Sequence, residues 1–261
     1  MKPVCLLAVV MMLSGLAAAH AVPLPRPRPT QAPNVPPAPS PTVSQAETAE
    51  PDSSPPPSAC RLRLTTELAI APSLPPLTGP GECGVDDVVR LEAVVLPDKR
   101  RVALTPPATV RCTFAEAIAH WVREDVTAAV RSLKATLKSI DNFDSYECRG
   151  RNRVAGAKLS EHGRANALDI RSLVLGNGTR LDLTDPQVSK ESRETLRKSA
   201  CARFSTVLGP GSDGYHENHV HGDLAERRGG YRMCQWDVRE PDEESAPGSV
   251  PLPRPRPDID P

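Results

Sequence analysis

The sequence predicts an α+β domain in which a helical first half packs on a small antiparallel sheet. Three observations support this. Apolar residues recur with helical spacing within 114–140, two β-prone segments flank a turn at 176–178, and a second helix-forming segment covers 190–204. We therefore expect helices first along the chain, followed by the sheet and one more helix.

The elements of the first half follow from local patterns. Residues 87–96 are rich in valine and leucine with partial alternation, which predicts a strand. At Thr113 the sequence Thr-Phe-Ala-Glu matches a capping box, with Glu116 three residues after the cap. The apolar stripe that follows predicts one long helix or two consecutive helices over 114–140.

The elements of the second half begin with a hairpin. Residues 167–175 and 179–183 flank the turn Gly-Asn-Gly at 176–178, a composition typical of tight β-turns. A helix is expected over about 190–204, and a short strand over 219–225.

The N-terminal segment predicts export. Residues 1–21 combine an early lysine, a short apolar stretch and an Ala-His-Ala cleavage site, which together indicate a signal peptide. We expect the chain to cross the inner membrane and to act in the periplasm or cell envelope.

Proline-rich segments flank the expected domain at 60–240. Residues 22–59 and 241–261 bury too little apolar surface to fold, so we expect a disordered tether and tail. Both contain PLPRPRP, at 23–29 and 251–257. Two interpretations stay open: contact with an anionic wall polymer or membrane surface, or a spacer that resists proteolysis.

Composition excludes several classes of protein. The 261 residues include 32 basic and 32 acidic side chains, and this balance removes the usual argument for nucleic-acid binding. Aromatic residues are only 3%, too few for stacking platforms. After the N-terminal segment no apolar run is long enough to span a bilayer, so no transmembrane segment is expected. We expect a monomer.

Cysteine usage agrees with export. Apart from Cys5 in the signal peptide, six cysteines lie within the expected domain, which predicts three disulfides. Sequence alone does not choose among the connectivities. We favour sequence-local pairing: Cys60–Cys83, Cys112–Cys148 and Cys201–Cys234. The absence of a C-x-x-C pair argues against a zinc–cysteine cluster.

Four histidines lie in two short segments, 160–169 and 213–221. A histidine, an aspartate and an H-x-H pair make a plausible tetrahedral zinc site with an open position for water. On a strand, His219 and His221 project to the same side, and Glu217 joins them if the strand extends that far. Asp169, at the head of the hairpin, offers an oxygen ligand. The alternative is a set of surface histidines without metal.

These motifs resemble known families. S-x-H-x-x-x-x-A-L-D followed by a distal H-x-H resembles zinc peptidases that include D-alanyl-D-alanine carboxypeptidases and dipeptidases, lysostaphin-type enzymes and the penicillin-insensitive murein endopeptidase. More closely, SYECR at 145–149, LSEHGRANALDI at 159–170 and VLGPGSDGYHENHVHGDLA at 207–225 resemble the bacterial extensin-like C-terminal domain family. The resemblance covers roughly 60–228 and implies a hedgehog/DD-peptidase-type fold.

The resemblance implies roles for individual residues. His162, Asp169 and His221 correspond to the three zinc ligands. His219 corresponds to the histidine beside the metal-bound water, and His216 to a further active-site histidine of the murein endopeptidase.

Two departures from the relatives concern the same motifs. The relatives usually have glycine where this chain has Ala165, and they tend to carry an acid where it has Asn218. In the dipeptidases that acid is the general base. Its absence leaves His219 or Glu217 as the base, or signals weakened catalysis. Arg149, in SYECR, is the candidate cation for a tetrahedral oxyanion.

The sequence therefore predicts an exported, zinc-dependent carboxypeptidase or endopeptidase that acts on the peptide stems or crosslinks of peptidoglycan. A non-catalytic peptidoglycan-binding or envelope-binding module that retains the zinc site is the alternative. A purely structural proline-rich envelope protein is a third possibility, and it needs no metal.

Overall fold

A mixed sheet of ten strands organises the part of the chain that the structure describes. The computed structural model describes residues 57–240. The expected signal peptide, nearly all of the tether and the tail lie outside these residues. Within residues 57–240 no helix is long and apolar enough to cross a membrane.

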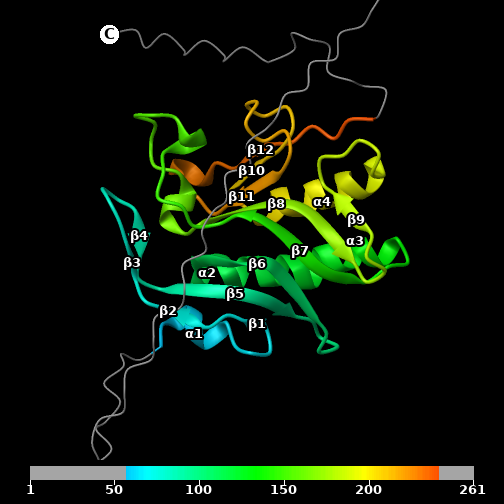
Figure 1. Ribbon diagram of the computed structural model, residues 1–261, viewed down its shortest axis with the longest axis horizontal. Helices are drawn as coiled ribbons and strands as arrows, with labels where there is room; N and C mark the ends of the chain where they lie inside the picture. The colour runs from blue at the N-terminus through cyan, green and yellow to red at the C-terminus, as the bar shows by residue number, and fades with distance from the viewer. Residues whose placement is uncertain (1–56, 241–261) are drawn as a thin grey trace, which may run out of the picture. The chain divides into compact units, whose positions relative to one another are not determined.

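The sheet has the strand order β1-β5-β6-β7-β8-β11-β10-β12, with β2 also paired to β5 and β9 to β8 (Figure 1). Most pairs are antiparallel, but β6–β7 and β10–β12 are parallel. The strands are β1 (Ala69–Ile70), β2 (Ser73–Leu74), β5 (Val88–Val95), β6 (Arg101–Arg111), β7 (Leu137–Asp144), β8 (Ala167–Leu175), β9 (Arg180–Asp182), β10 (Thr206–Leu208), β11 (Val220–Asp223) and β12 (Met233–Gln235). A separate small hairpin joins β3 (Leu77–Thr78) and β4 (Gly84–Val85).

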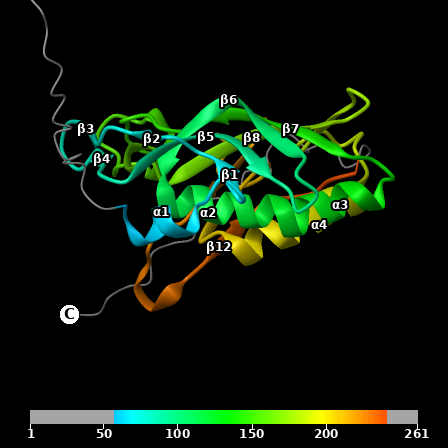
Figure 2. The ribbon, with the colours of Figure 1, turned by 90° about the horizontal axis from the view of Figure 1, so that it is seen from below.

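Helices cover one face of this sheet (Figure 2). They are α1 (Ala59–Arg63), α2 (Cys112–Trp121), the π-helical turn η1 (Val122–Val126), α3 (Thr127–Ser132) and α4 (Lys190–Arg203). Short 3₁₀ turns η2 (Arg151–Arg153), η3 (Glu161–Arg164) and η4 (Arg228–Gly230) lie in loops. The layers meet in an apolar core, where the rings of Phe114 and Trp121 lie 5.8 and 5.4 Å from that of Phe204.

The helix expected over 114–140 begins and ends differently. It begins at Cys112, and Thr113 lies inside the first turn without capping it, so the predicted capping box is wrong. The Cys112 amide donates to the carbonyl of Asp87 (2.8 Å) instead, and Glu116 pairs with Arg63. Strand β6 leads directly into α2, so the preceding backbone replaces a side-chain cap.

The end of the expected helix is a strand. Helix α3 ends at Ser132, Lys134 adopts a left-handed conformation (φ 57°), and β7 begins at Leu137. Leu137 and Ile140 are both buried, and their spacing of three residues is also typical of a helix. The apolar pattern therefore predicted a helix where the chain forms a strand. A register shift between Leu137 and Ser139 turns both apolar side chains inward although they lie an odd number of residues apart.

The expected helical first half and small antiparallel sheet are therefore corrected. The longest strand, β6, lies in the first half and was missed because it contains Pro106 and Pro107. Proline cannot donate to a ladder, but both prolines lie where the β5–β6 register shifts between Leu91 and Ala93, so the ladder requires no amide there.

Other expectations are confirmed. The strand expected over 87–96 is β5, and the hairpin is β8–β9, closed by a turn in which Gly178 has a φ of 87°. The second helix is α4 and the short strand is β11.

Three disulfides form, but with a different connectivity. They join Cys60–Cys112, Cys83–Cys148 and Cys201–Cys234, so sequence-local pairing is correct only for the last. The other two connect residues 52 and 65 positions apart. Only the folded chain brings the β3–β4 hairpin to the segment after β7, and α1 to the start of α2.

Candidate metal centre

A cleft of about 580 Å³ lies beside the central strands and contains all four histidines of the two motifs. The ends of β7 and β8, strand β11 and the loops around 145–164 and 209–219 form its walls. Segments far apart in the sequence therefore meet at one site.

His162 is presented by the short turn η3. Ser160 caps this turn by accepting a hydrogen bond from the His162 amide (3.3 Å), and the His162 side chain is buried. Ala165 ends the turn with φ 50° and ψ 35°. That left-handed conformation is one that glycine adopts without a steric penalty and that other residues rarely adopt.

Asp169 and His221 come from neighbouring strands. They are directly opposite each other in the β8–β11 ladder, and both are buried. Their register places His221 Nδ1 2.9 Å from Asp169 Oδ1.

These three side chains converge on one point. His162 Nε2 lies 3.1 Å from His221 Nδ1 and 3.2 Å from Asp169 Oδ1. A tetrahedral zinc ion with bonds of about 2.0–2.1 Å separates its ligand atoms by roughly 3.3 Å. The spacing of the three atoms therefore fits such an ion.

Hydrogen bonds on the outer sides of the His162 and His221 rings determine which nitrogen of each ring carries a lone pair. His162 Nδ1 donates to the carbonyl of Ser145, and His221 Nε2 donates to Asp223 Oδ2 (3.1 Å). In their neutral forms both rings then point a lone pair at the Asp169 carboxylate. Three acceptors that face one another need a cation between them, either a metal ion or a proton.

The pKa values in the metal-free protein agree with this. Burial lowers the pKa of His221, but hydrogen bonds with Asp169 and Asp223 outweigh burial and raise it to about 9. Burial raises the pKa of Asp169, but hydrogen bonds with His162 and His221 hold it well below its usual range. Without metal, a proton on His221 supplies the missing positive charge.

His219 lies beside this group without belonging to it. Its Nε2 is 3.5 Å from Asp169 Oδ2, and its ring is 5.0 Å from that of Phe143. Its Nδ1 donates to Asn218 Oδ1 (2.8 Å), which leaves the Nε2 lone pair on the side of Asp169. Burial lowers the pKa of His219 to about 4, so the ring is neutral at pH 7.

His216 lies next to His219 and His221 in the cleft. Its ring is 5.1 Å from that of His219 and 5.6 Å from that of His221. Its Nδ1 donates to Asp213 (2.7 Å), which also accepts from Asn152. The loop thus orients a second imidazole toward the cleft.

Of the last two residues expected at the site, Arg149 lies in the cleft and Glu217 lies outside it. Arg149 lines the cleft, where its Nη2 and Nε bind Asp144 and Glu147 at 2.9 Å each. Glu217 is exposed and accepts a hydrogen bond from the Gly211 amide (2.9 Å). The structure does not bring Glu217 to the histidines.

Comparison with known proteins places this site in a family. A family model described as the extensin-like protein C-terminus matches residues 58–235, which run from α1 through β12. The chain belongs to this extensin-like family. No curated protein and no solved structure is detectably similar to it.

Sequence reasoning missed several residues of the extensin-like site. Asp223 continues the alternation of His219 and His221 along the strand, so an H-x-H-x-D pattern could have revealed it. Asp213 and Phe143 carry no comparable signal. Ser145 acts through its backbone carbonyl, which no side-chain pattern reveals.

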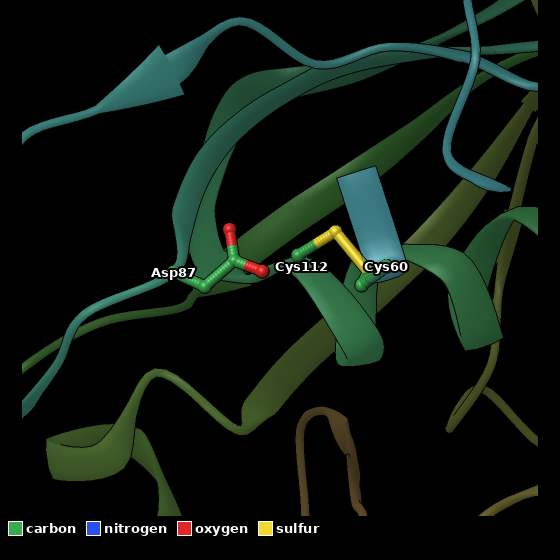
Figure 3. A group of neighbouring side chains, drawn as sticks. All are labelled: Cys60, Asp87 and Cys112. Carbon is green, nitrogen blue, oxygen red and sulfur yellow. A yellow bond between two sulfur atoms is a disulfide. The ribbon is translucent and has the colours of Figure 1, made fainter. Parts of the chain in front are cut away.

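A second group of potential ligand residues lies at the start of the extensin-like match. Cys60, Asp87 and Cys112 are close together, and Figure 3 shows the two cysteines joined as a disulfide beside the Asp87 carboxylate. A disulfide has no thiolate to bind a metal. Asp87 accepts from the Ser58 hydroxyl (2.5 Å) and supports the start of the domain instead.

Proposed function

We propose that this extensin-like domain is an exported zinc metallopeptidase that acts on the peptide stems or crosslinks of peptidoglycan. The observation that carries the proposal is the convergence of three acceptor atoms, from His162, Asp169 and His221, on one point at the wall of an open cleft. Such a site holds a metal next to space for a substrate.

The residues at that point suit zinc. Two imidazoles and one carboxylate are ligands that zinc commonly takes in catalytic sites, with a fourth position open. Zinc bound in this way lowers the pKa of a coordinated water towards 7 and polarises a scissile carbonyl.

His219 is suited to act as the general base. Its Nε2 is unprotonated at neutral pH and lies 3.5 Å from Oδ2 of Asp169, a proposed metal ligand. Asn218 holds the ring in this tautomer by accepting from Nδ1. In this proposal Asn218 positions the base, whereas the zinc dipeptidases that the motifs resemble carry an acid there that is itself the base.

Arg149 and His216 have supporting roles in this proposal. Asp144 and Glu147 occupy Nη2 and Nε of Arg149, so Nη1 is the nitrogen left to stabilise an oxyanion. His216, held by Asp213, is a second group for proton transfer at the same wall of the cleft.

Location and substrate are part of the same proposal. Three disulfides suit an oxidising compartment such as the periplasm, where peptidoglycan is the abundant peptide-containing polymer. We place the protein there as a monomer.

A binding module that retains zinc but does not cleave is the second candidate. It is favoured by Asn218, which cannot accept a proton at neutral pH, and by the position of Glu217 outside the histidine group.

Incubation of the zinc-loaded, disulfide-intact chain with purified muropeptides, followed by mass spectrometry, separates the two candidates. Hydrolysis adds one water to a substrate and exposes a new amine terminus, and we expect such products. Retention of muropeptides without any new terminus would support the binding module instead.

A further inference from the structure

The buried Asp223 carboxylate accepts a hydrogen bond from His221, a proposed metal ligand, on the side of the ring that faces away from Asp169. Its side chain is 6% exposed, and its Oδ2 accepts from His221 Nε2 at 3.1 Å. Asp223 follows His221 by two residues on β11, so both side chains lie on the same face of the strand. We infer that Asp223 is a positioning residue that makes Nδ1 the metal-binding nitrogen of His221. This inference rests on the proposed zinc site.

The two histidine ligands would then bind through different nitrogens. A carbonyl oxygen can only accept, so Ser145 keeps the proton of His162 on Nδ1 and leaves Nε2 for the metal. A carboxylate also only accepts, so Asp223 keeps the proton of His221 on Nε2 and leaves Nδ1 for the metal. The ring of each ligand is fixed by the group behind it.

Besides His221, two groups hold the Asp223 carboxylate. The Ala225 amide donates to its Oδ1 at 2.9 Å, and the Thr206 hydroxyl donates to the same carboxylate. Arg227 Nη2 donates to Thr206 Oγ1 (2.6 Å), which leaves the Thr206 proton for Asp223. A chain of hydrogen bonds therefore runs from the cleft wall at Arg227 to His221.

Asp223→Asn is the informative change because asparagine has nearly the same shape. With its oxygen kept on the Ala225 amide, the new amide nitrogen faces His221 and donates to Nε2. The His221 proton then moves to Nδ1, the nitrogen needed for the metal. The flipped amide restores the acceptor for His221 but sets an N–H group against the Ala225 amide.

Zinc affinity is the first measurement, made by competition with a chromophoric chelator on the full, disulfide-intact chain. We expect Asp223→Asn to bind zinc about 10- to 100-fold more weakly than wild type. Glu124→Gln is the matched control. Glu124 also contacts a histidine, His120, but on the exposed surface of the helical layer, so its loss should leave zinc affinity unchanged.

Unchanged zinc affinity in Asp223→Asn would overturn the inference and leave the proposed zinc site standing. A wild type that takes up no zinc would overturn the proposed function and the inference together. These two failures are therefore distinguishable.

Imidazole nitrogen shifts provide a readout that does not depend on the variant's folding. In zinc-loaded wild type, long-range ¹H–¹⁵N spectra should show His221 protonated at Nε2 and His162 protonated at Nδ1. A His221 ring protonated at Nδ1 would overturn the inference.

Discussion

At the scale of single residues, three histidines of similar burial have different chemistry because their partners differ. His162 faces a carbonyl, His221 faces a carboxylate on each side, and His219 faces an asparagine amide. The partners raise the pKa of His221 to about 9, while burial lowers that of His219 to about 4. Neighbouring groups, not sequence position, distinguish the histidine proposed as a ligand from the one proposed as the base.

His219→Ala and His221→Ala should differ in zinc content. His221→Ala removes a ligand and should abolish both zinc binding and turnover, as should His162→Ala or Asp169→Ala for zinc. His219→Ala should keep the zinc and lower turnover by roughly 10²–10⁴-fold. Metal analysis and muropeptide cleavage on the same samples check this. Full activity in His219→Ala would assign the base elsewhere, with His216 the nearest candidate.

Asn218→Asp should preserve or raise turnover. Aspartate still accepts from His219 Nδ1, so the tautomer is kept, and its charge makes the ring a stronger base. A gain of up to about tenfold corresponds to about 1.4 kcal/mol in the barrier. Asn177→Asp, in the distant hairpin turn, is the control for charge alone. An inert wild type beside an active Asn218→Asp would favour the binding module for the natural protein.

At the scale of elements, the site depends on short, irregular segments that longer elements and disulfides hold in place. The turn that presents His162 touches the β3–β4 hairpin, since a Cβ at Gly163 would lie only 3.3 Å from Cys83 Sγ. Cys83 is bonded to Cys148, three residues after the Ser145 carbonyl that orients His162. This disulfide therefore supports both sides of His162, one of the proposed metal ligands.

Removing the Cys83–Cys148 disulfide by serine substitution should weaken zinc binding by roughly 10- to 100-fold, because His162 loses its support. The matched control is Cys60–Cys112, which closes a loop of similar length away from the cleft. Both changes should lower stability by about 2–4 kcal/mol. Chelator competition and denaturant unfolding measure the two effects. Equal zinc affinities in the two variants would contradict the bracing role.

At the scale of the whole molecule, metal binding and folding share the same buried charges. In the metal-free protein, His221 has a raised pKa and His219 a lowered one. The raised pKa of His221 stabilises the folded state when that ring is protonated. The lowered pKa of His219 stabilises the folded state when that ring is neutral. Their opposite shifts make the stability of the metal-free domain depend on pH from both sides.

The metal-free domain should be most stable near pH 6.5. The contribution of His221 is fully present below about 6.5 and is lost as pH rises through about 9. The contribution of His219 is present above about 6.5 and is lost as pH falls through about 4. We expect each side to change the free energy of unfolding by roughly 1–3 kcal/mol. Denaturant unfolding after chelation measures it. His219→Ala should reduce the loss of stability on the acid side, to which carboxylates such as Asp169 also contribute, and should leave the basic side unchanged.

The amino-acid sequence alone pointed to the candidate site and to much of the local structure. His162, Asp169 and the H-x-H pair were recognisable as a candidate metal-binding set, and β5, the β8–β9 hairpin, α4 and β11 follow from local periodicity. The number of disulfides followed from the six cysteines of the domain.

Only the tertiary structure decided which residues meet. The disulfide between Cys83 and Cys148, the strand from Leu137, and the placement of Glu217 away from the histidines depend on contacts between distant segments. The same holds for Asp223 behind His221, where a carboxylate gains its role from the ring it faces. Local patterns report which face of an element is apolar. They contain no information about strand register or loop packing, and these set the distances between the groups of the site.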